Sequence, residues 1–282
     1  MANPVFSRSG TFNGRRRGMN AGYQQGYPQG GPQQHAGYAP QGYPQQPGMP
    51  PQQEAYQPSG PVMTLDDVLI KTGITLAGVA AIAAATFILL PVQLAFPAVI
   101  LSAIVGFITV MIVARRHTVS PAGVLFYAAI EGVFVGAFSK VFELQWPGIV
   151  FSAVMATFIT AFATLAAYKI FNIRVTSKMR KIVTITTMAI AGVMLVNLGL
   201  VLFGVNTGIR AAGPDAGLLA IGVSIFCVIL AVLNLIVDFD YVERGIATRA
   251  PASESWRAAL GITVTMVWLY TELLRILSYF RN

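Results

Sequence analysis

The sequence predicts an all-α membrane protein, in which seven transmembrane helices follow a disordered N-terminal tail. Of the 282 residues, 55% are hydrophobic and 11% are charged, whereas about a quarter of the residues of a soluble domain are charged. The mean hydropathy is +0.64. Gly, Pro, Gln and Tyr occupy 36 of the first 60 positions, and such a segment buries too little apolar surface to offset the entropy of ordering. The chain therefore divides into a low-complexity tail, residues 1–61, and a membrane domain, residues 62–282.

The membrane domain contains seven apolar runs of about the 20 residues that a spanning helix needs. The runs cover residues 68–90, 92–114, 124–142, 150–170, 182–205, 218–237 and 256–280. Residues 90–92 form a very short turn, so the first two helices are expected to form a tight antiparallel hairpin. In the third run, Gly132 and Gly136 have the GxxxG spacing that lets two helix backbones approach closely. Packing within the domain and a dimer interface both fit that spacing.

Positive charge is expected at alternate ends of these helices. The formal net charge is +8. Basic residues cluster in the tail and after the second, fourth and sixth runs, whereas the loops on the other side contain or adjoin only Lys140 and Arg210. Because Lys and Arg stay on the cytoplasmic side, the sequence predicts a cell-membrane protein with a cytoplasmic N-terminus. Seven crossings then place the C-terminus outside, unless the semi-polar seventh run re-enters. The bilayer, and not nucleic acid, is the partner that this charge pattern predicts.

Four carboxylates lie in or beside the predicted spans, and they are the candidates for an ion pathway or for pH sensing. A charge at mid-bilayer costs at least about 2.5 kcal/mol, so it marks a functional candidate. Glu131 lies near mid-membrane in the third run. Asp238 and Asp240 lie at the cytoplasmic end of the sixth run, and Glu272 lies in the seventh.

Each of these acids also has a structural interpretation. Glu131 fits a neutral, hydrogen-bonded group that fixes helix packing. Asp238 fits an interfacial carboxylate, and Glu272 fits a local pair with Arg275, three residues later, near the outer surface.

Asp238 is the preferred inward-facing group among the four. Asn234, Asp238 and Tyr241 share one helix face, and a polar stripe of this kind suits the interior of a bundle. Asp240 points about 200° away from Asp238, and its position four residues before Arg244 favours a local ion pair.

An ionised Asp238 needs a cationic partner, because an unpaired buried charge is costly. Arg115, Arg116 and Arg257 are the candidates from the cytoplasmic side, and such a pair would close the pathway like a latch. A carboxyl group in a low dielectric binds its proton more tightly than in water. Protonation would remove the attraction to the arginine, so the latch is predicted to open as the pH falls.

Enzymatic chemistry is not predicted. The chain has two histidines, His35 in the tail and His117 in a loop, and a single cysteine, Cys227. These residues provide neither a histidine-based metal site nor an intrachain disulfide. The sequence contains no HExxH, GxSxG or Walker-type motif. We therefore expect no cofactor, and no metal beyond transiently bound Ca²⁺.

The helix count and three short motifs resemble the Bax inhibitor-1/YccA family, also known as the transmembrane Bax inhibitor motif family. Residues 129–132 read Ala-Ile-Glu-Gly, residues 234–240 read Asn-Leu-Ile-Val-Asp-Phe-Asp, and residues 273–277 read Leu-Leu-Arg-Ile-Leu. The Gly/Tyr/Gln/Pro-rich tail resembles that of actinobacterial members, although the resemblance itself covers residues 62–282.

This resemblance implies a central seventh helix ringed by the other six and, for bacterial members, a proton-sensitive calcium leak. In such members an aspartate at the end of helix six pairs with one in helix seven. Asp238 matches the first position, whereas alignment through residues 273–277 places Thr265 at the second. Glu272 lies two turns further along helix seven. This chain therefore either lacks the acid pair or replaces the second acid with Glu131.

Two functions follow from these observations. The first is a multi-pass membrane protein that passes calcium or another cation and is gated by Asp238. The second is a non-conducting stress or quality-control modulator that binds other membrane proteins, such as a membrane protease, through its tail.

Overall fold

The computed structural model describes residues 60–281 and contains seven long helices in that part of the chain. They are α1 (Leu65–Leu89), α2 (Val92–Arg115), α3 (Pro121–Gln145), α4 (Ile149–Ile170), α5 (Ser177–Leu202), α6 (Leu218–Ala247) and α7 (Glu254–Ser278). All seven are long and apolar enough to cross a membrane, which confirms the predicted all-α membrane fold. The predicted tail lies almost entirely outside the described residues.

Polar caps explain why several helices begin before their apolar runs. Thr64, Ser120 and Thr176 precede α1, α3 and α5, and each side chain accepts a hydrogen bond from the backbone N–H three residues later. Such caps satisfy amides that have no partner within the helix. Hydropathy detects only the apolar segment that follows, so the predicted starts of these three helices are three to five residues late.

The largest difference from the predicted boundaries is in α6, which ends at Ala247 and not at residue 237. The additional turns are polar and project beyond the apolar run. Asp238 therefore lies nine residues inside the helix end, about 14 Å by helical rise. The sequence placed it at the end of the helix because hydropathy falls there, although the backbone continues as a helix.

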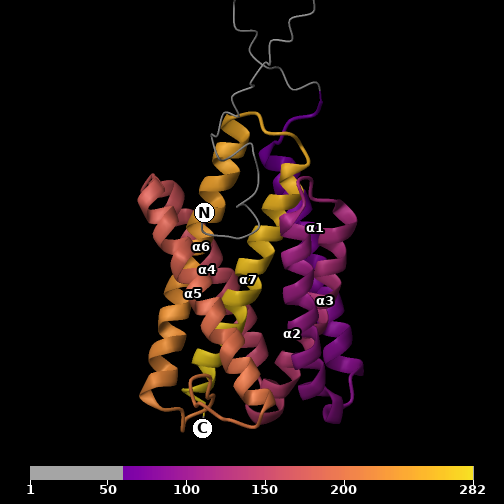
Figure 1. Cartoon of the computed structure of the whole chain (residues 1–282), viewed down its shortest axis with the longest axis vertical. Helices are drawn as coiled ribbons and strands as arrows, with labels where there is room; N and C mark the ends of the chain where they lie inside the picture. The colour runs from indigo at the N-terminus through magenta and orange to yellow at the C-terminus, as the bar shows by residue number, and fades with distance from the viewer. Residues whose placement is uncertain (1–59, 282) are drawn as a thin grey trace, which may run out of the picture.

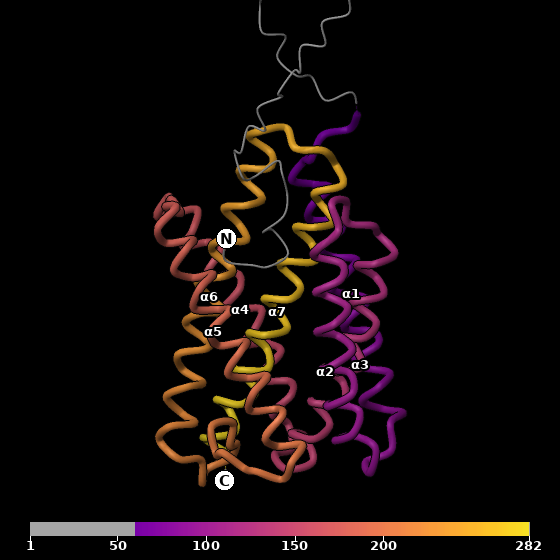
Figure 2. Tube along the Cα trace, in the orientation of Figure 1, coloured from indigo at the N-terminus to yellow at the C-terminus, as the bar shows by residue number. Residues whose placement is uncertain are grey.

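Helix α7 occupies the centre of the bundle (Figures 1 and 2) and packs against α1, α3, α4 and α6. It is the most deeply buried of the seven spans. Helix α2 packs mainly on α3, and α5 packs mainly on α6. The ring around α7 is therefore uneven, with α2 and α5 further from the centre.

The predicted tight hairpin of α1 and α2 is wrong, because both helices pack on α3 and hardly touch each other. Gly132 and Gly136 face α1, and a Cβ atom on Gly132 would lie 2.7 Å from Cβ of Ile82. The GxxxG spacing thus serves packing within the chain. A residue of α3 contacts the short turn between α1 and α2, because Nζ of Lys140 donates a hydrogen bond to the carbonyl of Leu90 at 2.5 Å.

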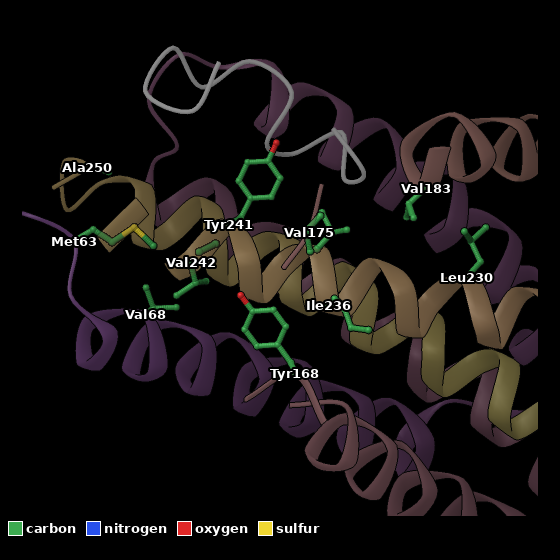
Figure 3. Packing of buried hydrophobic residues seen from close by; sticks show 12 residues of the cluster. Met63, Val68, Tyr168, Val175, Val183, Leu230, Ile236, Tyr241, Val242 and Ala250 are labelled. Carbon is green, nitrogen blue, oxygen red and sulfur yellow. The ribbon is translucent and has the colours of Figure 1, made fainter. Parts of the chain in front are cut away.

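The first described residues are attached to the loop between α6 and α7. Met63 N–H donates to the carbonyl of Ala250 at 2.7 Å, and Ala252 N–H donates to the carbonyl of Pro61 at 2.9 Å. Met63 is buried beside Ala250 and Val242 in an apolar cluster (Figure 3). This end of the bundle, called here the α6–α7 end, also carries the α2–α3 and α4–α5 loops, and α7 finishes at the opposite end (Figure 1).

Candidate functional site

Asp238 lies at the interface between α6 and α7 and is completely buried. Thr265 of α7 donates from its Oγ1 to Oδ2 of Asp238 at 2.6 Å. The same hydroxyl lies 3.1 Å from the carbonyl oxygen of Gly261, one turn earlier in α7. A hydroxyl has one proton to donate, so these two acceptors compete for it. Thr265, the residue that the family resemblance aligns with a second acid, thus contacts Asp238.

The polar stripe predicted on α6 is buried, but its members face different neighbours. Asn234 donates to Oγ1 of Thr187 on α5 at 2.9 Å and to the carbonyl of Leu230 at 2.8 Å. Asp238 contacts α7. Helical spacing identified the shared face correctly, whereas it carries no information on which helix packs against each position.

Asp240 belongs to a cluster of charges between α5 and α6. It pairs with Arg244 at 3.0 Å, which confirms the predicted local ion pair, and with Arg180 at 2.6 Å. The Arg180 guanidinium also lies 4.9 Å from the ring centre of Tyr241. Arg180 was not among the sequence candidates, because a basic residue near a helix start is also typical of a solvated surface.

Arg257 is fully buried near the start of α7 and connects it to the α2–α3 loop. Its guanidinium pairs with Glu254 at 2.9 Å and donates to three backbone carbonyls, those of Ala114, Arg116 and His117. The side chains of Arg115 and Arg116 are exposed. Arg257 and Thr265 share one face of α7, eight residues or about 12 Å apart. Of the three latch candidates, Arg257 is thus the one that lies inside the bundle.

Glu272 lies at the other end of α7 and is 2% exposed. Arg210, from the loop between α5 and α6, donates to both its carboxylate oxygens, at 2.7 and 3.1 Å. Arg275 lies 3.8 Å away and donates to the backbone carbonyl of Arg210 at 2.6 Å. The predicted pair with Arg275 is therefore secondary to a bidentate pair with Arg210. The signal that could have found it is that Arg210 is the one basic residue of its loop.

Glu131 is half-buried in α3 and lines a cavity of about 350 Å³ between α2, α3, α5 and α7. Its Oε2 would lie 3.2 Å from a Cβ atom on Gly106, so the glycine leaves room for the carboxylate against α2. Asp238 is not among the residues that line this cavity. The sequence left open that Glu131 replaces the second acid beside Asp238. The lining of this cavity does not support that hypothesis, and the residue beside Asp238 on α7 is Thr265.

Metal-ligating side chains do not converge within the part of the chain that the structure describes. Among residues 60–281, no group of three or more His, Cys, Asp or Glu side chains is arranged to hold a metal ion. The single cysteine, Cys227, is buried and not in a disulfide.

Seven long apolar helices with a carboxylate buried between two of them define a multi-pass integral membrane protein. A family model described as Bax inhibitor 1 like matches residues 3–282. The chain belongs to the Bax inhibitor 1-like family, whose members are generally not enzymes. The match begins inside the tail, so it extends further than the resemblance over residues 62–282. None of the curated proteins matches the chain.

Proposed function

We propose that this protein is a cation leak pathway, for Ca²⁺ or another cation, whose opening is controlled by protonation of Asp238. The observation that carries the proposal is the completely buried carboxylate of Asp238, bound by Thr265 across the interface between α6 and α7. Buried acids in membrane spans are costly and typically serve ion or proton pathways. Hard cations prefer carboxylate and carbonyl oxygens as ligands.

Protonation would change the hydrogen bond between the two helices. An ionised Asp238 can only accept, so the Thr265 proton is directed to it. A protonated Asp238 becomes a donor to Oγ1 of Thr265, and the hydroxyl proton then turns to the carbonyl of Gly261, 3.1 Å away. Charge-assisted hydrogen bonds are roughly twice as strong as neutral ones. Protonation therefore weakens the link between α6 and α7 and favours an open pathway.

A pathway that follows α7 would meet a second barrier at the opposite end of the bundle. Glu272 lies seven residues beyond Thr265, about 10 Å along the axis. There Arg210 and Arg275 surround its carboxylate, and Gly213 N–H donates to Oγ of Ser278 at 3.0 Å. The α5–α6 loop is attached to α7 at this end, and in the proposed pathway two positive charges against one negative charge would oppose the passage of a cation.

The proposal includes an orientation, with the α6–α7 end in the cytoplasm of a cell-membrane protein. It rests on the exposed basic side chains Arg115, Arg116, Arg174, Lys178 and Arg249 at that end. A cysteine that replaces Thr207, in the loop after α5, should react with a membrane-impermeant maleimide added to intact cells, after replacement of Cys227 by Ser. A cysteine at Arg249 should react only after the cells are opened. The reverse labelling pattern would invert this orientation.

Flux through the purified protein tests the proposal directly. Full-length protein reconstituted in liposomes with a trapped calcium indicator should give Ca²⁺ flux that rises as the pH falls. Thr265 binds a single titrating carboxyl group, that of Asp238, so the response should be shallow, near one proton per opening. A steep response would require a second coupled acid. Absence of flux at every pH and with every cation tested would reject the leak.

The second candidate function is that of a non-conducting modulator that binds other membrane proteins. One observation favours it, namely that Pro61 and Met63 attach the beginning of the membrane domain to the α6–α7 loop. A partner bound to the tail would act directly on the two helices that hold Asp238. Capture of a membrane protease by the full-length chain, together with absence of flux, would select this function.

A further inference from the structure

The cavity that contains Glu131 differs in character from the interface that holds Asp238. Helices α2, α3, α5 and α7 form its walls, and four of its lining residues are aromatic: Phe107, Tyr127, Phe134 and Trp268. Glu131 is the one charged residue in the lining. No Lys, Arg or His among residues 60–281 forms an ion pair with Glu131. The cavity therefore offers a single carboxyl group, hydrogen-bonded to Tyr127 and surrounded by aromatic rings.

The cavity is accessible from the side of the bundle. Phe107 and Leu195 line it and are 38% and 43% exposed, so its rim reaches the surface that faces lipid. Helix α5, which forms one wall, has Val183 as its only buried residue. A molecule dissolved in the bilayer can reach this site without crossing either end of the bundle.

The lining excludes most ligand classes. An anion is repelled by Glu131. An inorganic cation such as Ca²⁺ needs six to eight oxygen ligands, whereas the lining side chains supply oxygen only from Glu131 and Tyr127. A neutral apolar molecule would leave the carboxylate with only the hydroxyl of Tyr127 as its partner. An organic cation satisfies both features, because its charge is attracted to the carboxylate and to the aromatic faces, and its apolar body fills the remaining space.

We propose that this cavity is a binding site for lipophilic organic cations, in which Glu131 neutralises the charge and the four aromatic residues enclose the apolar body. A volume of about 350 Å³ lies in the range of small-molecule sites, roughly 300–1,000 Å³. Gly106 contributes by leaving space for the carboxylate against α2. The site is independent of the proposed leak, because Asp238 and Thr265 do not line it.

Equilibrium binding of radiolabelled tetraphenylphosphonium to the purified full-length protein tests this site, with neutral triphenylphosphine oxide as the uncharged analogue. The wild type should bind the cation more tightly than the neutral probe. Glu131→Gln keeps the shape of the side chain and removes its charge. It should therefore weaken cation binding at least about tenfold, because the attraction between two opposite charges is strong in a low dielectric. Binding of the neutral probe should not change. Glu243→Gln, at an exposed carboxylate on α6, and Asp238→Asn should both bind the cation as the wild type does.

A second variant keeps the test decisive if Glu131→Gln does not fold. Ala191→Trp, on the α5 wall, fills the cavity and should abolish binding of both probes. Absence of cation binding to the wild type would overturn the proposal, as would equal binding of the two probes or unchanged cation binding in Glu131→Gln. Displacement of tetraphenylphosphonium by equimolar Ca²⁺ would assign the cavity to inorganic cations instead.

Discussion

Replacement of Asp238 by Asn is expected to raise cation flux at neutral pH at least about fivefold and to make it nearly independent of pH. Asn has the shape of the protonated acid and cannot ionise, so the charge-assisted bond with Thr265 becomes a neutral one. The difference between the two kinds of hydrogen bond is about 1 kcal/mol, which corresponds to about a fivefold shift toward the open state. Flux into liposomes at a series of pH values, for wild type and variant, measures both effects.

Three further variants separate this effect from a general loss of packing. Thr265→Val removes the donor, so it should raise flux at neutral pH and reduce the pH dependence, because protonation of Asp238 then has no bond to Thr265 to weaken. Glu243→Gln makes the same acid-to-amide change at an exposed position of α6 and should behave as the wild type. Asp240→Asn breaks the cluster with Arg180 and Arg244 and is expected to lower thermal stability without removing the pH response. An equal effect of Asp238→Asn and Asp240→Asn on the pH response would refute the role of Asp238.

Replacement of Glu272 by Gln is expected to destabilise the protein by about 3–5 kcal/mol, the typical cost of removing one partner of a buried ion pair. Glu272 is 2% exposed, and Arg275 beside it is 6% exposed. Without the carboxylate, Arg275 and Arg210 are left close together, and the α5–α6 loop loses its main attachment to α7. A large fall in the melting temperature of the detergent-solubilised protein should report this change.

A double-mutant cycle provides the control for this prediction. Arg210→Gln combined with Glu272→Gln should cost less than the sum of the two single changes, because the second removes a charge that the first has left without its partner. Strict additivity would mean that the two residues do not interact in solution. A melting temperature of Glu272→Gln equal to that of the wild type would show that the loop is held by other contacts, such as Gly213 with Ser278.

The number and positions of the spans, the basic ends of the helices and the burial of Asp238 were all predictable from the sequence. Each depends on a property that is local along the chain. The length of an apolar run identifies a transmembrane helix, and the basic residues between the runs identify the basic ends of the helices. Helical periodicity places Asn234 and Asp238 on one face. Dependence on local hydropathy also explains the error in the predicted end of α6. Hydropathy falls after residue 237, although the helix continues through the polar residues that follow.

The partners of the buried charges depended on how the helices pack. Periodicity states which side of a helix a residue occupies but not which neighbour lies there. Asn234 therefore meets α5, Asp238 meets α7, and α1 packs on α3 instead of on α2. The pairing of Arg210 with Glu272 joins residues 62 positions apart, and the cavity around Glu131 needs four helices to exist. Such contacts arise from close packing of small and large side chains across helices, which no single segment of the sequence specifies.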